Sequence, residues 1–308
     1  MAWLLPEGYE IFPGRGSSGV TVVVARRARA ALLESGLERP EEAVAGPAVA
    51  AWVGGGRVRH PVIRAGEERW LLKAYRRGGL LRRLNPDRYW RTSRFLRELW
   101  TAVAAARAGV PAPEPIALIL RAAGWGGAYR VWQVVRYVPG VSSLREILDG
   151  RAPAGFRARS LTGIFRAAGS AVRKMHEAHI DHPDLNVGNI LARVSGVNGA
   201  ENGANGPGQS QVFPEAFIVD WDRARLRQRG SWNPHRNLLR LWRSALKLAR
   251  LSRPPVVPDP AALRAFLRGY FGRNRSDLRA LRGYLRPRRP LIALHAALWE
   301  VARRGKLS

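Results

Sequence analysis

Cysteine is absent from this chain of 308 residues, which excludes disulfide bonds and thiolate metal sites. Lysine is scarce, at four residues, so arginine supplies nearly all of the basic charge. Acidic residues are few as well: 23 of them against 52 basic ones give a net charge of +29. Codon bias in a GC-rich genome is one explanation for the arginine. The physical consequence is the same in either case, because such a surface attracts polyanions such as nucleic acids, anionic lipid head groups and phosphorylated glycolipids.

Long apolar runs are also missing. No stretch is long enough to span a bilayer, and the first residues lack the basic segment and apolar run of a signal peptide. We therefore expect a cytoplasmic protein whose contact with a membrane surface would rest on charge. Hydrophobic residues make up 46% of the chain, which is enough for a core in one large domain or in two lobes.

The most informative stretch is residues 182–191, with the sequence HPDLNVGNIL, followed by FIVDWD at residues 217–222. The spacing H-x-D-L-x-x-x-N, followed by a strand that ends in aspartate, is typical of the catalytic loop of kinase-like enzymes. Transfer of a phosphoryl group needs positioning and neutralisation of charge more than covalent help. A turn aspartate alone would be weak evidence, but the combination favours a phosphoryl-transfer site.

Each of these polar residues has an expected role. Asp184 would orient the acceptor hydroxyl and receive its proton, and His182 would brace the loop through its ring nitrogens. Asn189 and Asp220 would ligate Mg²⁺, a hard ion that prefers oxygen ligands. Asp222 is either a further metal ligand, which we favour, or the ion-pair partner of an arginine that follows it.

A second group of candidates lies upstream. Residues 70–75 read as a strand with Lys73 on its polar side, where it would reach the α- and β-phosphates of ATP. The alternative is an exposed edge-strand lysine, although the scarcity of lysine in this chain favours a function. Residues 94–108 read as a helix with an apolar stripe, and Glu98 beside that stripe is the candidate partner of Lys73. A solvated helix acid is the alternative.

Two glycine-rich segments invite a nucleotide-binding interpretation. Residues 14–19 match G-x-G-x-x-G but precede a strand, so a turn between two strands is expected there instead. Gly54, Gly55 and Gly56 lie between two short β-type runs, and glycines let backbone N–H groups approach phosphate oxygens. We expect this loop to cover the phosphates, with a plain hairpin turn as the alternative.

Residues 138–140 break a strand and are expected to form the hinge between two lobes. The backbone of Val135 to Tyr137 would then hydrogen-bond the adenine edge, unless this is only a loop after an edge strand. The expected division is an N-lobe of residues 1–138 and a C-lobe of residues 139–308. Within the C-lobe, residues 182–189 form the catalytic loop, and residues 195–214, rich in Gly, Asn, Ser and Gln, form a flexible insert without chemistry.

The order of elements is strands first, then mostly helices. His176 and His179 near the end of one helix are expected to be packed rather than to bind a metal, since no other ligands accompany them. Hydrophobic periodicity predicts strands at residues 20–24, 48–52, 58–63, 70–75, 115–120 and 129–138, and helices at residues 28–35, 94–108, 144–148, 161–178, 233–251, 259–270, 276–285 and 291–303.

The segments at residues 70–79, 97–99, 182–191 and 218–223 resemble the lipopolysaccharide core kinases, most closely the 3-deoxy-D-manno-octulosonic acid (Kdo) kinase type. The likeness covers roughly residues 50–250. It implies an α+β, bilobal protein-kinase-like fold with a mainly antiparallel β N-lobe and a mainly helical C-lobe. It also implies ATP and Mg²⁺ as cofactors, and Kdo attached to lipid A as the acceptor at the cytoplasmic face of the inner membrane.

The arginine excess agrees with an anionic glycolipid acceptor and an anionic membrane surface. Arg76 and Arg77 after the lysine strand, and Arg223 and Arg225 after Asp220, are the expected contacts. Two alternatives stay open. One is a small-molecule kinase of the aminoglycoside or choline type, which the basic surface argues against. The other is a polyanion-binding pseudokinase, which would not need the catalytic residues. No motif indicates a specific nucleic-acid partner, and the oligomeric state is not predicted.

Overall fold

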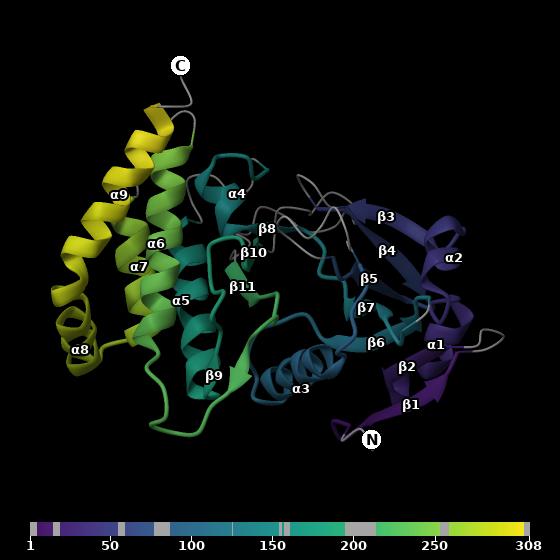
Figure 1. Cartoon of the computed structure of the whole chain (residues 1–308). Coiled ribbons are helices and arrows are strands. Elements are labelled where there is room, and N and C mark those ends of the chain that lie inside the picture. Colours follow the sequence, from purple (N-terminus) through teal and green to yellow (C-terminus); the bar gives the residue numbers. More distant parts are fainter. Residues whose placement is uncertain are drawn as a thin grey trace, which may run out of the picture. The chain divides into compact units, whose positions relative to one another are not determined.

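The structure is a computed structural model (Figure 1). It describes residues 5–14, 19–54, 59–76, 87–124, 126–153, 156, 161–194, 214–252 and 259–304. The chain divides into two compact units. The first contains Met1–Ala106 and Pro113–Val138, and the second contains Arg107–Ala112 and Pro139–Ser308. The first is built around a sheet and the second mainly of helices, so the expected α+β class is confirmed.

The first unit contains a seven-stranded antiparallel sheet in the order β1-β2-β6-β7-β5-β4-β3. Its strands are rich in β-branched residues, which suit a pleated and half-buried surface. The strands are β1 (Tyr9–Pro13), β2 (Val20–Ala25), β3 (Val49–Val53), β4 (His60–Ala65), β5 (Glu68–Ala74), β6 (Pro115–Ala122) and β7 (Tyr129–Arg136). Short helices α1 (Arg29–Glu34) and α2 (Pro40–Ala45) follow β2, and the sequence analysis missed α2.

The main helix of this unit is α3 (Ser93–Arg107), and its apolar stripe joins the core of the sheet. Phe95 and Leu99 are fully buried, and the Phe95 ring lies 4.5 Å from that of Tyr75, centroid to centroid. β1 and β2 form an antiparallel hairpin. The expected position of residues 14–19 between two strands is therefore confirmed, and residues 15–18 lie outside the described part of the chain.

The second unit holds the remaining helices. They are α4 (Leu144–Leu148), α5 (Leu161–Glu177), α6 (His235–Leu251), α7 (Pro260–Phe271), α8 (Arg275–Leu285) and α9 (Arg289–Arg304). Each predicted helix is present with its ends shifted by no more than a residue or two. Asp259 caps α7 by accepting a hydrogen bond from the Ala261 N–H at 2.7 Å, as expected for an N-cap.

Short strands connect these helices and were not all predicted. β8 (Val141–Ser143), β10 (Ile190–Val194) and β11 (Pro214–Ile218) form a sheet in the order β11-β10-β8. β9 (Ile180–Asp181) pairs with β12 (Arg225–Leu226). The predicted insert at residues 195–214 connects β10 to β11, and all of it except Pro214 lies outside the described residues.

Helices α5 and α7 pack side by side through two glycines (Figure 1). A Cβ atom on Gly169 would lie 2.1 Å from the Phe266 carbonyl oxygen, and one on Gly269 would lie 2.0 Å from the Arg166 carbonyl oxygen. These distances are far below van der Waals contact, so only glycine at both positions permits the two backbones to approach this closely.

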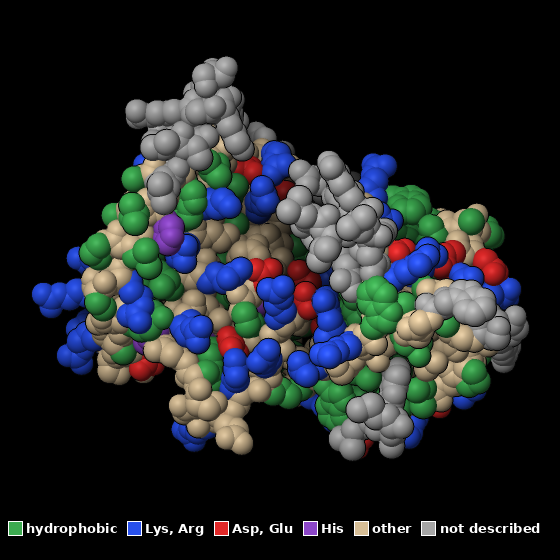
Figure 2. Space-filling model, in the orientation of Figure 1, with side chains coloured by type: hydrophobic (Ala, Val, Ile, Leu, Met, Phe, Trp, Pro, Cys, Tyr) green, Lys and Arg blue, Asp and Glu red, His purple; other side chains and the backbone are tan. Residues whose placement is uncertain are grey.

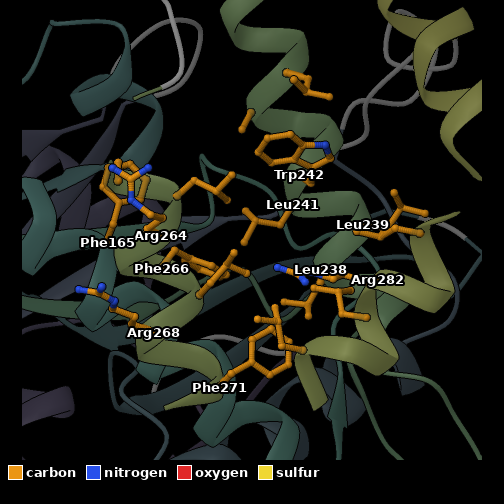
Figure 3. A pocket seen from close by; sticks show the side chains of 18 of the residues that line it. Phe165, Leu238, Leu239, Leu241, Trp242, Arg264, Phe266, Arg268, Phe271 and Arg282 are labelled. Carbon is orange, nitrogen blue, oxygen red and sulfur yellow. The ribbon is translucent and has the colours of Figure 1, made fainter. Parts of the chain in front are cut away.

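An apolar cavity of about 1070 Å³ lies among the helices of the second unit (Figure 3). Leu238, Leu241 and Phe266 face it together with Trp242 and Ala245. Trp242, Ala245 and Leu248 are only half-buried, although they lie on the apolar face of α6 that the periodicity predicts to be buried. For Trp242 and Ala245 the reason is the cavity itself, which leaves their inner sides without packed neighbours.

The surface carries the charge imbalance of the sequence. Figure 2 shows that Lys and Arg side chains are spread over the visible face, where Asp and Glu side chains are few. Among the described residues, none of the helices combines the length and the apolar character that a bilayer-crossing segment requires.

Candidate active site

The catalytic loop begins directly after β9, and two asparagine side chains fix its shape. The backbone carbonyl of Asp184 accepts hydrogen bonds from Asn186 Nδ2 at 2.8 Å and from Asn189 Nδ2 at 3.0 Å. The Gly188 N–H donates to Asn186 Oδ1 at 2.8 Å, which closes the turn. Asn189 thus uses the nitrogen of its amide inside the loop, which leaves Oδ1 as the atom suited to a hard cation.

The segment that carries Asp220 is bound to this loop through the backbone N–H and the backbone carbonyl of the preceding residue, Val219. β10 and β11 pair antiparallel, and the chain then continues into Val219. The Val219 N–H donates to the Asn189 carbonyl at 3.0 Å, and its carbonyl lies 3.3 Å from His182 Nε2. Asp220 follows with φ +65°, a conformation that residues other than glycine adopt only when their surroundings impose it.

His182 braces the loop with one ring nitrogen rather than two, which corrects the expectation. Nε2 faces a carbonyl acceptor and therefore carries the proton, while Nδ1 has no hydrogen-bond partner among the described residues. The side chain is fully buried, and burial lowers its pKa, although the carboxylates of Asp220 and Asp184 act in the opposite direction. His182 is therefore a neutral support near both carboxylates.

Asn237 of α6 holds the start of the loop, a role that was not predicted from the sequence. Its Oδ1 accepts a hydrogen bond from the His182 backbone N–H at 3.0 Å, and its Nδ2 donates to Asp181 Oδ1 at 3.1 Å. Arg227 Nη2 in turn donates to Asp181 Oδ2 at 2.8 Å. Asn237 is only 2% exposed. A polar residue on the buried face of an amphipathic helix was the available signal, because buried amides are nearly always hydrogen-bonded.

His176 completes this network and is packed, as expected. Its Nε2 lies 3.2 Å from Asn237 Oδ1, and its Nδ1 lies 2.7 Å from the Tyr270 hydroxyl. Burial lowers the pKa of His176 from 6.5 to about 3, against the hydrogen bond to Asn237, which raises it. In the described part of the chain, no group of three or more His, Cys, Asp and Glu side chains is placed to hold a metal ion.

We expect the stability of the protein to fall in mild acid because of His176. The unfolded chain takes up a proton at this residue below about pH 6.5, whereas the folded protein does not do so until about pH 3. Protonation therefore favours unfolding as the pH falls through this window, by up to about 1.4 kcal/mol per pH unit. Urea unfolding measures the free energy of unfolding at pH 7.5 and 5.0. The decrease between these two pH values should be smaller for His176→Gln than for the original chain. Equal losses would contradict the assignment.

One ion pair at the loop was not predicted. Arg240 of α6 places its Nη2 2.5 Å from Asp184 Oδ1. Arg240 lies on the outer face of the helix, as the periodicity indicates. The local sequence pattern does not predict which acidic residue it contacts. The proposed base and an arginine are thus direct neighbours in this structure.

The first unit holds the upstream candidates. Lys73 lies on β5 opposite Gln133 of β7, with its Nζ 5.9 Å from the centroid of the Tyr75 ring. Glu98 is only 2% exposed, which argues against the alternative of a solvated helix acid. Gly54 adopts φ +108°, in the region that favours glycine, and Gly55 and Gly56 lie outside the described residues, as does Arg77.

The expected adenine contact needs a correction. The Tyr137 N–H donates to the Arg69 carbonyl at 2.8 Å, and Val135 lies inside the sheet, opposite Leu71 of β5 and Pro115 of β6. β7 has a neighbour on both sides up to its end, so its backbone groups are used by the sheet. Among the backbone groups of Val135 to Tyr137, we keep the Tyr137 carbonyl as the candidate hydrogen-bond acceptor for a nucleotide base.

Asp222 lies in the turn after Trp221, which the Ala224 N–H closes by donating to the Trp221 carbonyl at 2.9 Å. Its role as a metal ligand stays a prediction. In all, the second unit brings His182, Asp184 and Asn189 together with the segment that carries Asp220, through the contacts described above.

Comparison with known proteins gives a consistent result. The model of the lipopolysaccharide kinase (Kdo/WaaP) family matches residues 49–270. The chain is 30% identical over 180 residues to the 3-deoxy-D-manno-octulosonic acid kinase of Vibrio parahaemolyticus serotype O3:K6 (strain RIMD 2210633). This alignment covers 57% of this chain and 64% of that protein, which is somewhat less than two thirds of the relative's length. It is 30% identical over 220 residues to the enzyme of the same name from Xylella fastidiosa (strain M12), and that alignment covers 65% of this chain and 74% of the relative.

A solved structure described as "WaaP in complex with acyl carrier protein" is 19% identical, with 87% of this chain and 95% of that chain covered and a TM-score of 0.48. The range that the family model matches contains Lys73, the catalytic loop and Asp220, while α8 and α9 lie beyond it. The chain therefore belongs to the lipopolysaccharide kinase (Kdo/WaaP) family, which confirms the expected kinase-like fold.

Proposed function

We propose that this protein transfers the γ-phosphoryl group of ATP to a sugar hydroxyl of the lipopolysaccharide inner core, with Kdo attached to lipid A as the acceptor. The observation that carries the proposal is the double fastening of Val219, which holds the segment of Asp220 against the loop of Asp184 and Asn189. Membership in a family of lipopolysaccharide kinases supports the same reaction.

Each residue has a role in this reaction. The acceptor hydroxyl oxygen forms a bond to the γ-phosphorus, the bond between that phosphorus and the bridging oxygen of ADP breaks, and the hydroxyl proton passes to Asp184. Lys73, supported by Glu98, binds the phosphates, and the loop at Gly54 covers them. The Tyr137 carbonyl accepts a hydrogen bond from the adenine amino group.

The residues at the loop suit Mg²⁺. Asn189 Oδ1 and the carboxylates of Asp220 and Asp222 offer only oxygen ligands, and Mg²⁺ usually takes one or two carboxylates together with phosphate oxygens and water. When bound, the ion would neutralise charge on the transferred phosphoryl group.

Incubation of the chain with ATP, Mg²⁺ and a panel of acceptors tests the proposal. The panel contains Kdo–lipid A, lipid A without Kdo, an aminoglycoside and choline, and mass spectrometry detects an added phosphate. We expect a phosphate only on Kdo–lipid A. Phosphorylation of the aminoglycoside or of choline alone would favour a small-molecule kinase, and an absence of Mg²⁺-dependent ATP binding would favour a polyanion-binding pseudokinase.

We also propose that the protein docks on the anionic cytoplasmic face of the inner membrane through α8 and α9. Asp277 is the only acidic residue between positions 273 and 297, all of which are described. Two leucines, Leu291 and Leu294, are 53% and 56% exposed on α9. Exposed arginines beside exposed leucines are typical of helices that lie at a lipid interface. The exposed arginines of this segment are Arg273, Arg275, Arg279, Arg282, Arg286 and Arg289.

Neutralising part of this surface should weaken binding to anionic vesicles. We expect the quadruple variant with Arg279, Arg282, Arg286 and Arg289 changed to Gln to lose most of its binding to phosphatidylglycerol vesicles, because each basic residue contributes about 1 kcal/mol near such a surface. Co-sedimentation measures it. The matched control changes four exposed arginines of the first unit to Gln, namely Arg26, Arg59, Arg64 and Arg69. An equal loss in both variants would point to net charge rather than to this surface.

A further inference from the structure

The ion pair between Arg240 and Asp184 is open to solvent, with 54% and 46% of the two side chains exposed. Such exposed pairs contribute at most about 1 kcal/mol to stability, so the fold does not depend on it. A guanidinium group has five N–H donors, and among the described residues Arg240 forms one contact, from Nη2 to Asp184 Oδ1. Arg240 therefore has donors left for a second anion.

The position of Arg240 suits an acceptor that carries a negative charge. An anionic group on the acceptor would share the guanidinium with Asp184 and offset its charge. A neutral acceptor would leave the remaining donors of Arg240 without an anionic partner, and a cationic acceptor would be repelled by its charge.

The surroundings of Arg240 also suit an anion. Arg236 lies one turn before Arg240 on the same face of α6, is exposed, and forms no ion pair among the described residues. Arg225 of β12 lies opposite Asp181, just before the catalytic loop. The Asp181 carboxylate is already bound by Arg227 and Asn237. Arg240 and Arg236 thus offer an incoming anion two exposed guanidinium groups on one face of α6.

We propose that Arg240 binds the carboxylate of an acidic sugar acceptor and, by bridging it to Asp184, places a hydroxyl of the same sugar at that residue. The inference rests on the proposed function and adds a carboxylate subsite to it. A planar guanidinium binds a carboxylate through two parallel N–H donors, which fixes the orientation of the sugar as well as its charge.

The test compares two acceptors and two enzymes. Kdo–lipid A is used as such and with the Kdo carboxylate converted to a primary amide, which removes the charge and little else. We expect the original chain to lose about 10- to 100-fold in kcat/KM on the amide, the effect of one hydrogen bond to a charged group. Arg240→Gln should lose a similar factor on the acid, mainly through the KM of the acceptor, and should not discriminate between the two acceptors.

Controls separate this subsite from a structural role. Arg240→Lys should restore part of the preference for the acid, since it keeps the charge without the planar fork. Arg250→Gln, on the same helix and also exposed, should retain full discrimination. The KM for ATP and the thermal unfolding midpoint should be unchanged in Arg240→Gln.

Three outcomes would overturn the proposal. Equal discrimination by Arg240→Gln and the original chain would show that Arg240 does not contact the carboxylate. If the difference in kcat/KM between Arg240→Gln and the original chain disappears when a lipid A phosphate is removed, and not when the carboxylate is converted, Arg240 would be assigned to that phosphate. Equal binding of the free sugar acid to both enzymes, measured by calorimetry without turnover, would also refute it. A chain inactive on every acceptor that still binds the free sugar acid through Arg240 would instead contradict the proposed function.

Discussion

Asp184→Asn should lower the rate of phosphate transfer by about 10²- to 10⁴-fold, the range typical for loss of a positioned proton acceptor. Asparagine has nearly the same shape, but its amide does not accept the hydroxyl proton. The hydrogen bonds that shape the loop are made to the backbone carbonyl of Asp184, from Asn186 and Asn189. The substitution should therefore leave the loop and the fold intact, so that the loss appears in kcat.

The measurement is single-turnover transfer to Kdo–lipid A, together with the affinity for ATP, which should change little. Asp277→Asn makes the same chemical change at an exposed position of α8 and should retain full activity. Retention of turnover in Asp184→Asn would remove this residue as the proton acceptor. Loss of ATP binding in the variant would instead assign Asp184 to the nucleotide.

Gly169→Ala should destabilise the protein by about 3 kcal/mol or more, at the upper end of overpacking substitutions. The new methyl group would lie 2.1 Å from the Phe266 carbonyl oxygen and 2.9 Å from the Tyr270 backbone nitrogen. Both are backbone atoms of α7, so relief requires movement of the whole helix. That movement would disturb the contact of the Tyr270 hydroxyl with His176, which leads through Asn237 to the catalytic loop.

Gly283→Ala is the matched control. Gly283 lies within α8 and is exposed, and apart from its chain neighbours and the backbone of its own helix no heavy atom of the described residues lies within 4 Å of the position of its added Cβ. The better helix propensity of alanine should make this variant more stable by up to about 1 kcal/mol. Urea unfolding measures the change in the free energy of unfolding, which should be negative for Gly169→Ala and positive for Gly283→Ala. A Gly169→Ala protein as stable as the original chain would mean that α5 and α7 do not approach this closely.

The two substitutions differ although both replace a helical glycine. Local propensity favours alanine in each case, and the sequence around either position predicts the same small gain. Only the contact between α5 and α7 reverses the sign at Gly169, because a backbone carbonyl of another helix occupies the space. A prediction from sequence alone would therefore have been wrong at this position.

Several features of the site were predicted from the sequence. The spacing from His182 to Asn189 indicates the loop, and the β-type run before Asp220 indicates the strand that delivers it. The bounds of α4 follow equally from local patterns. These features depend on neighbours within a few residues, where helical and strand periodicity act directly.

Other features depended on contacts between residues far apart in the chain. Asn237 reaches His182 across 55 positions, and Arg240 reaches Asp184 across 56. The Tyr137 N–H was expected to meet adenine, but it is used by Arg69 of the neighbouring strand. The sequence by itself determined which residues are polar or apolar and, within a residue or two, the bounds of every described α-helix except α2, because those depend on local backbone and side-chain preferences. Only the tertiary structure decided which polar groups meet, because hydrogen bonds and ion pairs form between whatever side chains packing brings within about 3 Å.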